Sequence, residues 1–320
     1  MTDVSVFGAG AFGTALAISL ARDGREVSLV ARDRTHAADM SVSRENAARL
    51  PGFAFPAGLR PVAESANAAA ICLIAVPTQK LSDFVMQRAE ALAGRHLIAC
   101  CKGVDIATGH GPTRVIADAV PDAKVAVLSG PSFAVDIAAG LPTALTVAAV
   151  DPAIAETLQR TLSTTNLRLY RTNDVIGVEL GGALKNIVAI ASGVAIGAGL
   201  GESARAALIT RGYAELRRFA EYAGAVPDTL SGLSGFGDLV LTCTSEKSRN
   251  FTYGLAIGRG LPRPQNVTVE GASSAKAVSK LALARKIDMP LTRTVSALVD
   301  EKLSVAEAID LLLSRPLKEE

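Results

Sequence analysis

A glycine pattern at the start of the chain constrains its fold most. Four residues with strand preference, Val4 to Phe7, run directly into Gly8, Gly10 and Gly13, and a helical pattern from Ala15 to Arg22 follows. The first glycine permits a tight turn, the second lets a pyrophosphate approach the backbone, and the third lets the helix pack close to the strand. The free N–H groups of the helix start then face the anion. The pattern predicts a dinucleotide-binding unit; a glycine-rich turn that holds no nucleotide is the alternative.

Polar or glycine turns follow four further apolar runs. The runs cover residues 26–31, 70–76, 97–101 and 125–128, and they end at Arg32-Asp33-Arg34, Pro77-Thr78, Lys102-Gly103 and Ser129-Gly130-Pro131-Ser132. Because the carboxyl ends of parallel strands meet at one edge of a sheet, we expect these turns beside the glycine loop, where ligands bind. Residues 143–149 and 166–171 would complete the sheet. The sequence therefore predicts an α/β Rossmann-type N-terminal domain with a mostly parallel sheet over residues 1–172.

Two positively charged side chains at this edge are candidates for binding an anionic group. Arg32, with Arg34 close behind it, follows the second strand, where an acidic residue commonly binds the ribose 2′-OH and an arginine admits the 2′-phosphate of NADP. We therefore expect NADP to be preferred and NAD to be possible, and solvated loop charges are the alternative. Lys102 directly follows a buried strand, so its ammonium can reach a ligand oxygen. A lysine whose stem covers apolar surface is the alternative there.

The second half of the chain changes character. From Thr172 to Ala204 the sequence is strongly apolar, and its only cation is Lys185. We expect a buried helix, in which desolvation disfavours the ammonium unless a partner compensates for it. Such a lysine suits proton transfer near neutral pH, and a structural ion pair is the alternative. The pattern predicts an all-α C-terminal domain over residues 173–320. We expect its later helices to begin near Ser203, Ser273, Arg293 and Ser304, the last with a capping box to Glu307.

Further polar groups follow in this half. A glycine-rich loop before Asp238 holds a single carboxylate. Ser248, Arg249 and Asn250 then offer a hydroxyl, a guanidinium and an amide, which are groups suited to clamping a phosphate. Glu270 could contact a ribose or a nicotinamide amide, and a charge at a helix N-terminus is the alternative.

Composition limits the other partners. A net charge of +2 over 320 residues does not indicate nucleic acid as the main partner. A core strand begins within three residues of Met1, which leaves no room for a signal peptide, and the most apolar region, 187–200, is too short to span a bilayer. The four cysteines lack Cys-x-x-Cys spacing and the three histidines fall at unrelated spacings. We therefore expect a cytoplasmic protein that is not integral to a membrane and has no metal site.

Together these motifs resemble those of bacterial NAD(P)-dependent glycerol-3-phosphate dehydrogenases. The match runs in order through the glycine loop and residues 102–103, 130–134, 180–187, 237–243, 248–250 and 269–271. The resemblance implies reversible hydride transfer between a nicotinamide and C2 of dihydroxyacetone phosphate. The product, sn-glycerol 3-phosphate, would supply the glycerophospholipid backbone. We also expect a homodimer.

The resemblance also implies roles for single residues. Lys185 is expected to be the proton acceptor or donor, with Lys102 and Asp238 as further catalytic residues. Substrate contacts are expected at Lys102, Gly130, Ser132, Lys185, Asn186, Asp238, Thr242, Ser248, Arg249 and Asn250. Cofactor contacts are expected at Gly8, Gly10, Ala11, Phe12, Gly13, Arg32, Lys102, Ala134, Arg249, Thr268 and Glu270.

The chain departs from its relatives at two places, and two other functions stay open. Ala11-Phe12 stands where Ser-Tyr or Ser-Trp is common, which removes a hydroxyl near the pyrophosphate, and Ser132 stands where threonine is common. One alternative is a two-domain ketopantoate reductase-like or 3-hydroxyacid dehydrogenase, which would not explain Ser248-Arg249-Asn250. The other is a nucleotide-binding sensor without turnover, which would not explain a buried lysine opposite a carboxylate.

Overall fold

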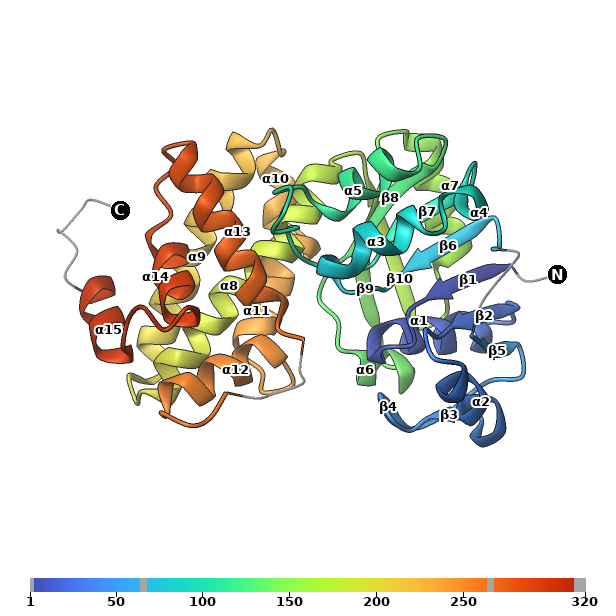
Figure 1. Ribbon diagram of the computed structural model, residues 1–320, viewed down its shortest axis with the longest axis horizontal. Helices are drawn as coiled ribbons and strands as arrows, with labels where there is room; N and C mark the ends of the chain where they lie inside the picture. The colour runs from blue at the N-terminus through green and yellow to red at the C-terminus, as the bar shows by residue number, and fades with distance from the viewer. Residues whose placement is uncertain (1–2, 64–67, 264–267, 314–320) are drawn as a thin grey trace. The chain divides into compact units, whose positions relative to one another are not determined.

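The computed structural model describes residues 3–63, 68–263 and 268–313 of the chain (Figure 1). The chain forms two compact units: unit 1 comprises Met1–Lys102 and Gly111–Glu179, and unit 2 comprises Gly103–His110 and Leu180–Glu320. Helix α8 (Val175–Gly197) runs through the last of these boundaries. The domain division expected between residues 172 and 173 stays a prediction.

An eight-stranded sheet forms the centre of unit 1. In sheet order its strands are β10 (Leu167–Thr172), β9 (Thr143–Ala148), β8 (Lys124–Ser129), β7 (His96–Ala99), β6 (Ile71–Ile74), β1 (Val4–Phe7), β2 (Val27–Val30) and β5 (Leu59–Val62). Among the described strands of this sheet, every neighbouring pair is parallel except β8 and β9. The Rossmann-type, mostly parallel sheet expected from the sequence is therefore confirmed.

Residues 45–62 contain strands that no sequence pattern indicated. The short strands β3 (Glu45–Asn46) and β4 (Leu50–Ala54) pair antiparallel, and β5 extends the edge of the large sheet. These strands carry Pro51 and Pro61 and are only partly buried, so they lack the continuous apolar run of the central strands.

Helices cover both faces of the large sheet. The helices on one face are α1 (Ala11–Arg22), α2 (Arg34–Ser43), α6 (Ala134–Ala138) and α7 (Pro152–Leu162). Those on the other face are α3 (Leu81–Met86), α4 (Ala89–Leu92) and α5 (Pro112–Ala119), with the short 3-10 turn η1 (Thr78–Lys80) before α3. Because both faces are covered, central strands such as β1 are buried along their whole length.

The turns expected to bind ligands lie at one edge of this sheet. Strands β2, β1, β6, β7 and β8 run parallel. The last residues of the first four pair in register, for example Phe7 with Val30 and with Ile74, and β8 extends two residues past the end of β7. The turns that follow these strands therefore leave the sheet on the same side. This is the edge at which α/β sheets bind their ligands.

The described part of unit 2 contains helices and no strands. Its elements are most of α8, then α9 (Gly201–Tyr222), α10 (Pro227–Ser231), the π turn η2 (Leu233–Gly237), α11 (Asp238–Cys243), α12 (Arg249–Gly258), α13 (Glu270–Ala284), α14 (Pro290–Val299) and α15 (Val305–Leu313). The expected all-α C-terminal part is confirmed.

Some expected helix starts are wrong by a few residues, whereas one is confirmed. Ser203 lies inside α9, which follows Leu200 without a side-chain cap, and α13 and α14 begin three residues before Ser273 and Arg293. A polar residue within the first turn is easily mistaken for the cap, since both favour a helix start. The capping box at Ser304 is present, because the Ser304 hydroxyl accepts from the Glu307 N–H and the Glu307 carboxylate accepts from the Ser304 N–H.

Helix α8 is the core helix of unit 2. It has 23 residues and is long and apolar enough to cross a bilayer, so the argument from a short apolar region over residues 187–200 is wrong. However, 83% of its most apolar window is buried within the structure. Burial against other helices accounts for its apolar composition on all sides.

Two carboxylates cap helices from distant parts of the chain. Glu179 accepts a hydrogen bond from the Thr113 N–H at the start of α5 (2.7 Å), and burial raises the pKa of its carboxyl to about 7. Glu215 is buried and accepts hydrogen bonds from the N–H groups of Leu291 (2.5 Å) and Thr292 (3.0 Å) at the start of α14. Free N–H groups at a helix start need such acceptors. Helix capping therefore explains why both carboxylates lie at these positions.

Four glycines let α8 and α12 approach to backbone contact. They are Gly193 and Gly197 on α8 and Gly254 and Gly258 on α12. A Cβ built on any of them would lie 2.1–2.4 Å from a carbonyl oxygen of the other helix. No side chain fits at these positions, so the glycines set the distance between the two helices.

We expect Gly254→Ala to destabilise unit 2. The new Cβ would lie 2.1 Å from the carbonyl oxygen of Ile190, so the two helices must separate, which costs about 1–3 kcal/mol. On an exposed helix surface the same change would instead stabilise by roughly 1 kcal/mol. Thermal unfolding checks this, with Thr252→Ala on the same helix as the control. A melting temperature for Gly254→Ala at or above that of the parent would contradict the packing argument.

Candidate functional site

The loop between β1 and α1 has the geometry that its glycines predict. Gly8 has a φ of 108°, which favours glycine, and a Cβ there would lie 2.6 Å from the Ala75 carbonyl oxygen. A Cβ at Gly13 would lie 2.2 Å from the Gly8 carbonyl oxygen, so glycine is needed for α1 to start this close to the strand. Gly10 precedes α1 and is exposed, and a Cβ there would meet nothing within 4 Å. The loop therefore presents open backbone at a helix N-terminus, which favours anions.

Four of the residues predicted to bind the substrate or the cofactor come together at this sheet edge. The Lys102 ammonium donates a hydrogen bond to the Gly130 carbonyl oxygen (2.9 Å), and the Ser132 hydroxyl donates to the same oxygen (3.3 Å). The Lys102 Nζ lies 6.0 Å from the ring centre of Phe12, which is within reach of a cation–π interaction. The start of α1 and the loops after β7 and β8 thus meet around one ammonium group.

The other predicted cofactor residues of unit 1 occupy helix starts or exposed positions. Arg32 follows β2 and is exposed, and its guanidinium has no polar partner among the described residues. The neighbouring Asp33 accepts a hydrogen bond from the Thr35 N–H (2.8 Å) and so caps α2. Ala11 opens α1 and Ala134 opens α6, so each offers its backbone at a helix start.

In unit 2, Lys185 forms a buried ion pair. Its side chain is almost completely buried, and its Nζ donates to Asp238 Oδ1 (2.5 Å) and to Thr242 Oγ1 (2.6 Å). Asp238 and Thr242 lie four residues apart on α11 and therefore on the same face of that helix. The sequence expectation of a buried lysine opposite this carboxylate is confirmed, and its role in proton transfer stays a prediction.

A chain of amide hydrogen bonds joins three helices beside this ion pair. Asn250 Nδ2 on α12 donates to Asn186 Oδ1 on α8 (2.9 Å), and Asn250 Oδ1 accepts from the Gly271 N–H on α13 (3.0 Å). A Cβ at Gly271 would lie 2.5 Å from the Asn186 carbonyl oxygen, so glycine is needed there. Both ends of the Asn250 amide are thus engaged within unit 2. Its expected contact with a phosphate would use the second N–H of Nδ2 and stays a prediction.

Asn186, Asn250 and Gly271 form a junction between three helices, and each of them directly follows a predicted site residue. Lys185 precedes Asn186, Arg249 precedes Asn250, and Glu270 precedes Gly271. Arg249 is exposed at the first position of α12, and the part of the chain that the structure describes offers its guanidinium no partner. The junction therefore fixes the backbone of three candidate residues relative to one another.

The remaining predicted residues lie near the same helix starts. The buried Ser248 caps α12, since its hydroxyl accepts from the Phe251 N–H (3.2 Å). Glu270 is half-buried at the first position of α13, and Thr268 is exposed two residues before it.

The sequence reasoning missed Asn46, which belongs to the candidate dinucleotide site of unit 1. Its completely buried amide hydrogen-bonds the Ala9 carbonyl oxygen inside the glycine loop. Asn46 stands in a polar stretch, so no apolar pattern marks it as buried. The sequence offers one signal, an asparagine just after the end of a helical segment. Asparagine is also common in turns, so this signal does not indicate a buried residue.

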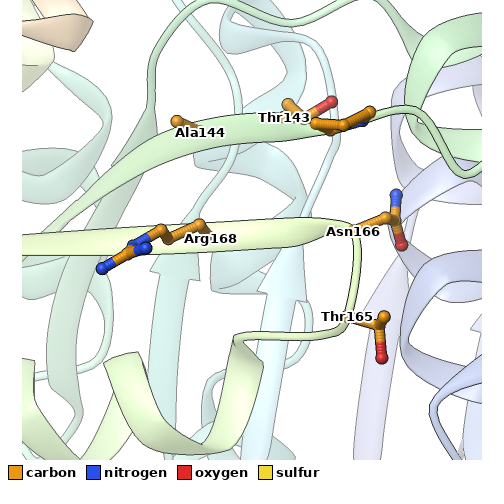
Figure 2. A pocket seen from close by; sticks show the side chains of 6 residues that line it. Thr143, Ala144, Thr165, Asn166 and Arg168 are labelled. Atoms are coloured by element: carbon orange, nitrogen blue, oxygen red, sulfur yellow. The ribbon is translucent and has the colours of Figure 1, made fainter.

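A shallow hollow elsewhere in unit 1 carries no candidate chemistry. It lies at the start of β9 and β10, and Figure 2 shows residues that line it. These are Pro142, Thr143, Ala144, Thr165, Asn166 and Arg168. None of the predicted site residues is among them. In the described ranges there is also no group of three or more His, Cys, Asp or Glu residues placed to hold a metal ion.

Comparisons with known proteins agree along the whole chain. The family model of the NAD-dependent glycerol-3-phosphate dehydrogenase N-terminus matches residues 3–155, and that of the C-terminus matches residues 174–310. The NAD(P)+ glycerol-3-phosphate dehydrogenases of Ruegeria sp. (strain TM1040) and Roseobacter denitrificans are 54% and 55% identical to this chain over 319 residues, which is 99% of each chain. The crystal structure of glycerol-3-phosphate dehydrogenase from Coxiella burnetii has a TM-score of 0.94 at 36% identity and covers 98% of this chain and 99% of its own.

These matches cover both units, and they confirm the resemblance that the sequence motifs indicated. The chain belongs to the NAD-dependent glycerol-3-phosphate dehydrogenase family.

Proposed function

We propose that the chain interconverts dihydroxyacetone phosphate and sn-glycerol 3-phosphate, with NADPH preferred and NADH possible as cofactor. The buried Lys185, held by Asp238 and Thr242, is the observation that carries this proposal. An ammonium in an apolar helix is costly to bury, and its two contacts fix the position of Nζ. Family membership supplies the substrate class.

Lys185 is the proton donor and acceptor of the reaction. When bound, a reduced nicotinamide supplies the hydride that adds to C2 of the ketone. The Lys185 ammonium donates a proton to the developing alkoxide oxygen, and in the reverse direction the neutral amine accepts the proton of the hydroxyl. Asp238 and Thr242 orient Nζ, and the positive charge stabilises the alkoxide in the transition state.

The start of α12 holds the phosphate of the substrate. Arg249 offers a guanidinium fork, and Ser248 and Asn250 flank it at the same helix N-terminus. A helix N-terminus favours an anion, and a guanidinium binds phosphate oxygens in pairs. Asn186, which bonds to Asn250, connects this phosphate site to Lys185 on α8.

Unit 1 binds the dinucleotide. The backbone of Gly8, Gly10 and Gly13 and the start of α1 at Ala11 and Phe12 receive the pyrophosphate. Arg32 pairs with the 2′-phosphate, which makes NADPH the preferred cofactor. The remaining assignments follow the family resemblance: substrate contacts at Lys102, Gly130 and Ser132, with Lys102 also stabilising the developing charge, and cofactor contacts at Lys102, Ala134, Arg249, Thr268 and Glu270.

Initial rates with different ketones test the reaction. Loss of NADPH should be fast with dihydroxyacetone phosphate and much slower with unphosphorylated dihydroxyacetone or ketopantoate, because only the first fills the phosphate site. A preference for ketopantoate would favour the ketopantoate reductase-like alternative. Binding of NADPH without turnover of any ketone would favour the sensor.

We further propose that the enzyme supplies the glycerophospholipid backbone as a cytoplasmic homodimer.

We expect Lys185→Met to abolish turnover while leaving the NADPH affinity nearly intact. Because the buried Asp238 carboxylate then loses its ammonium partner, the melting temperature should also fall. Methionine keeps the volume of the stem and removes the ammonium, and general acid–base catalysis contributes about 100–10,000-fold. The measurement is kcat on a variant that binds NADPH normally in a fluorescence titration. A fall in kcat below about tenfold would assign Lys185 to a structural ion pair.

We expect Arg249→Ala to raise KM for dihydroxyacetone phosphate more than it affects unphosphorylated dihydroxyacetone. A phosphate clamp acts in the ground state and the transition state alike, so most of its effect is on binding. Arg259→Ala, at the exposed C-terminal end of the same helix, is the matched control and should change neither. Equal fractional losses on both substrates would disprove the clamp.

We expect Arg32→Asp to shift the cofactor preference from NADPH toward NADH. The change removes the partner of the 2′-phosphate and adds repulsion, and a charged hydrogen bond of roughly 1.5–3 kcal/mol corresponds to about a 10–150-fold change in relative kcat/KM. Arg160→Asp, an equal charge reversal on the exposed face of α7, controls for net charge. If the NADPH/NADH ratio of the Arg32 variant stays within about twofold of the parent, another residue selects the cofactor.

A further inference from the structure

Asn46 connects the glycine loop to two helices of unit 1. Its Nδ2 donates to the Ala9 carbonyl oxygen (3.0 Å) and to Thr14 Oγ1 on α1 (2.8 Å). Its Oδ1 lies 2.9 Å from His36 Nε2 on α2. Because a side-chain amide nitrogen has two hydrogens and both are used, Oδ1 acts as the acceptor and His36 Nε2 as the donor. The side chain is completely buried, so water does not replace these bonds.

The bond to Ala9 sets the direction of the next amide group. In a trans peptide the carbonyl of one residue and the N–H of the next point in opposite directions, and the described chain has no cis peptide bonds. With the Ala9 oxygen directed at Asn46, the Gly10 N–H points away from it. Gly10 is exposed, and a Cβ there would meet nothing within 4 Å. The Gly10 N–H therefore lies where an anion can approach the loop.

Nothing local would keep the loop in this state. Rotation of the Ala9–Gly10 peptide changes ψ of Ala9 and φ of Gly10, and glycine tolerates most values of φ, so this rotation meets little steric resistance. Rotation would present a carbonyl oxygen instead of an N–H to the pyrophosphate and so repel it. The bond from Asn46 opposes this rotation, and the bond to Thr14 fixes Asn46 relative to the start of α1.

We propose that Asn46 is a positioning residue for the dinucleotide, which holds the glycine loop with the Gly10 N–H directed at the pyrophosphate. This inference rests on the proposed binding of a dinucleotide at that loop. It assigns to Asn46 no contact with the cofactor itself. Because NADPH and NADH share the pyrophosphate, loss of Asn46 weakens both equally and leaves the choice between them to Arg32.

The test measures the dissociation constants of NADPH and NADH by fluorescence titration. For Asn46→Ala we expect both to rise by the same factor, about tenfold or more, with the NADPH/NADH ratio and the KM for dihydroxyacetone phosphate within about twofold of the parent. Asn46→Asp keeps the size and the acceptor for His36 but loses both donors, so we expect at least the same loss. If the alanine variant does not fold, the aspartate variant decides the question.

Asn166→Ala is the matched control for a purely structural loss. Asn166 is also in unit 1, where its amide bonds to Ser19 and to the Ile137 carbonyl oxygen, and it has no contact with the glycine loop. This variant should lower the melting temperature and leave both dissociation constants unchanged. The proposal is overturned if the Asn46 variants lose stability as Asn166→Ala does while binding both dinucleotides as the parent does. A parent protein that binds neither dinucleotide would instead disprove the proposed function.

Discussion

Burial of one ammonium group is the constraint on which unit 2 depends. Lys185 lies in α8, a long and strongly apolar helix, where an uncompensated charge would cost several kcal/mol. Asp238 and Thr242 compensate for that cost only if α11 packs against α8 at this turn. A buried ion pair is a weak source of stability, since well-packed apolar residues of the same size stabilise as well or better. The proposed role in proton transfer would give a physical reason for keeping the charge.

The second constraint on unit 2 is the close contact of α8 with α12. Glycines on both helices bring the backbones together, and at this separation the amide of Asn250 reaches Asn186 and the start of α13 at Gly271. A bulkier residue at the glycine positions would move Arg249 away from Lys185 as well as loosen the core. Packing and the geometry of the candidate site are therefore set by the same contacts in this unit.

In unit 1 the groups proposed to bind the dinucleotide are mostly backbone groups, so binding depends on the conformation of the main chain. Gly8 and Gly13 permit the tight turn and the close start of α1, but they leave the orientation of the peptide between them free. The buried amide of Asn46 supplies the missing restraint from a separate part of the chain. Lys102 is restrained in a similar way by the Gly130 carbonyl oxygen.

The sequence by itself determined the features that depend on neighbouring residues. Buried parallel strands are continuous apolar runs ended by polar turns, so most of the sheet and the edge at which its turns gather were predictable, as was the capping box at Ser304. The buried Lys185 was predictable because one cation stood in an apolar helix. Only the tertiary structure decided the strands within residues 45–62, the junction through Asn250 and the restraint by Asn46. Each of these depends on groups that lie far apart in the sequence, and a polar side chain has the same local pattern whether it faces water or a buried partner.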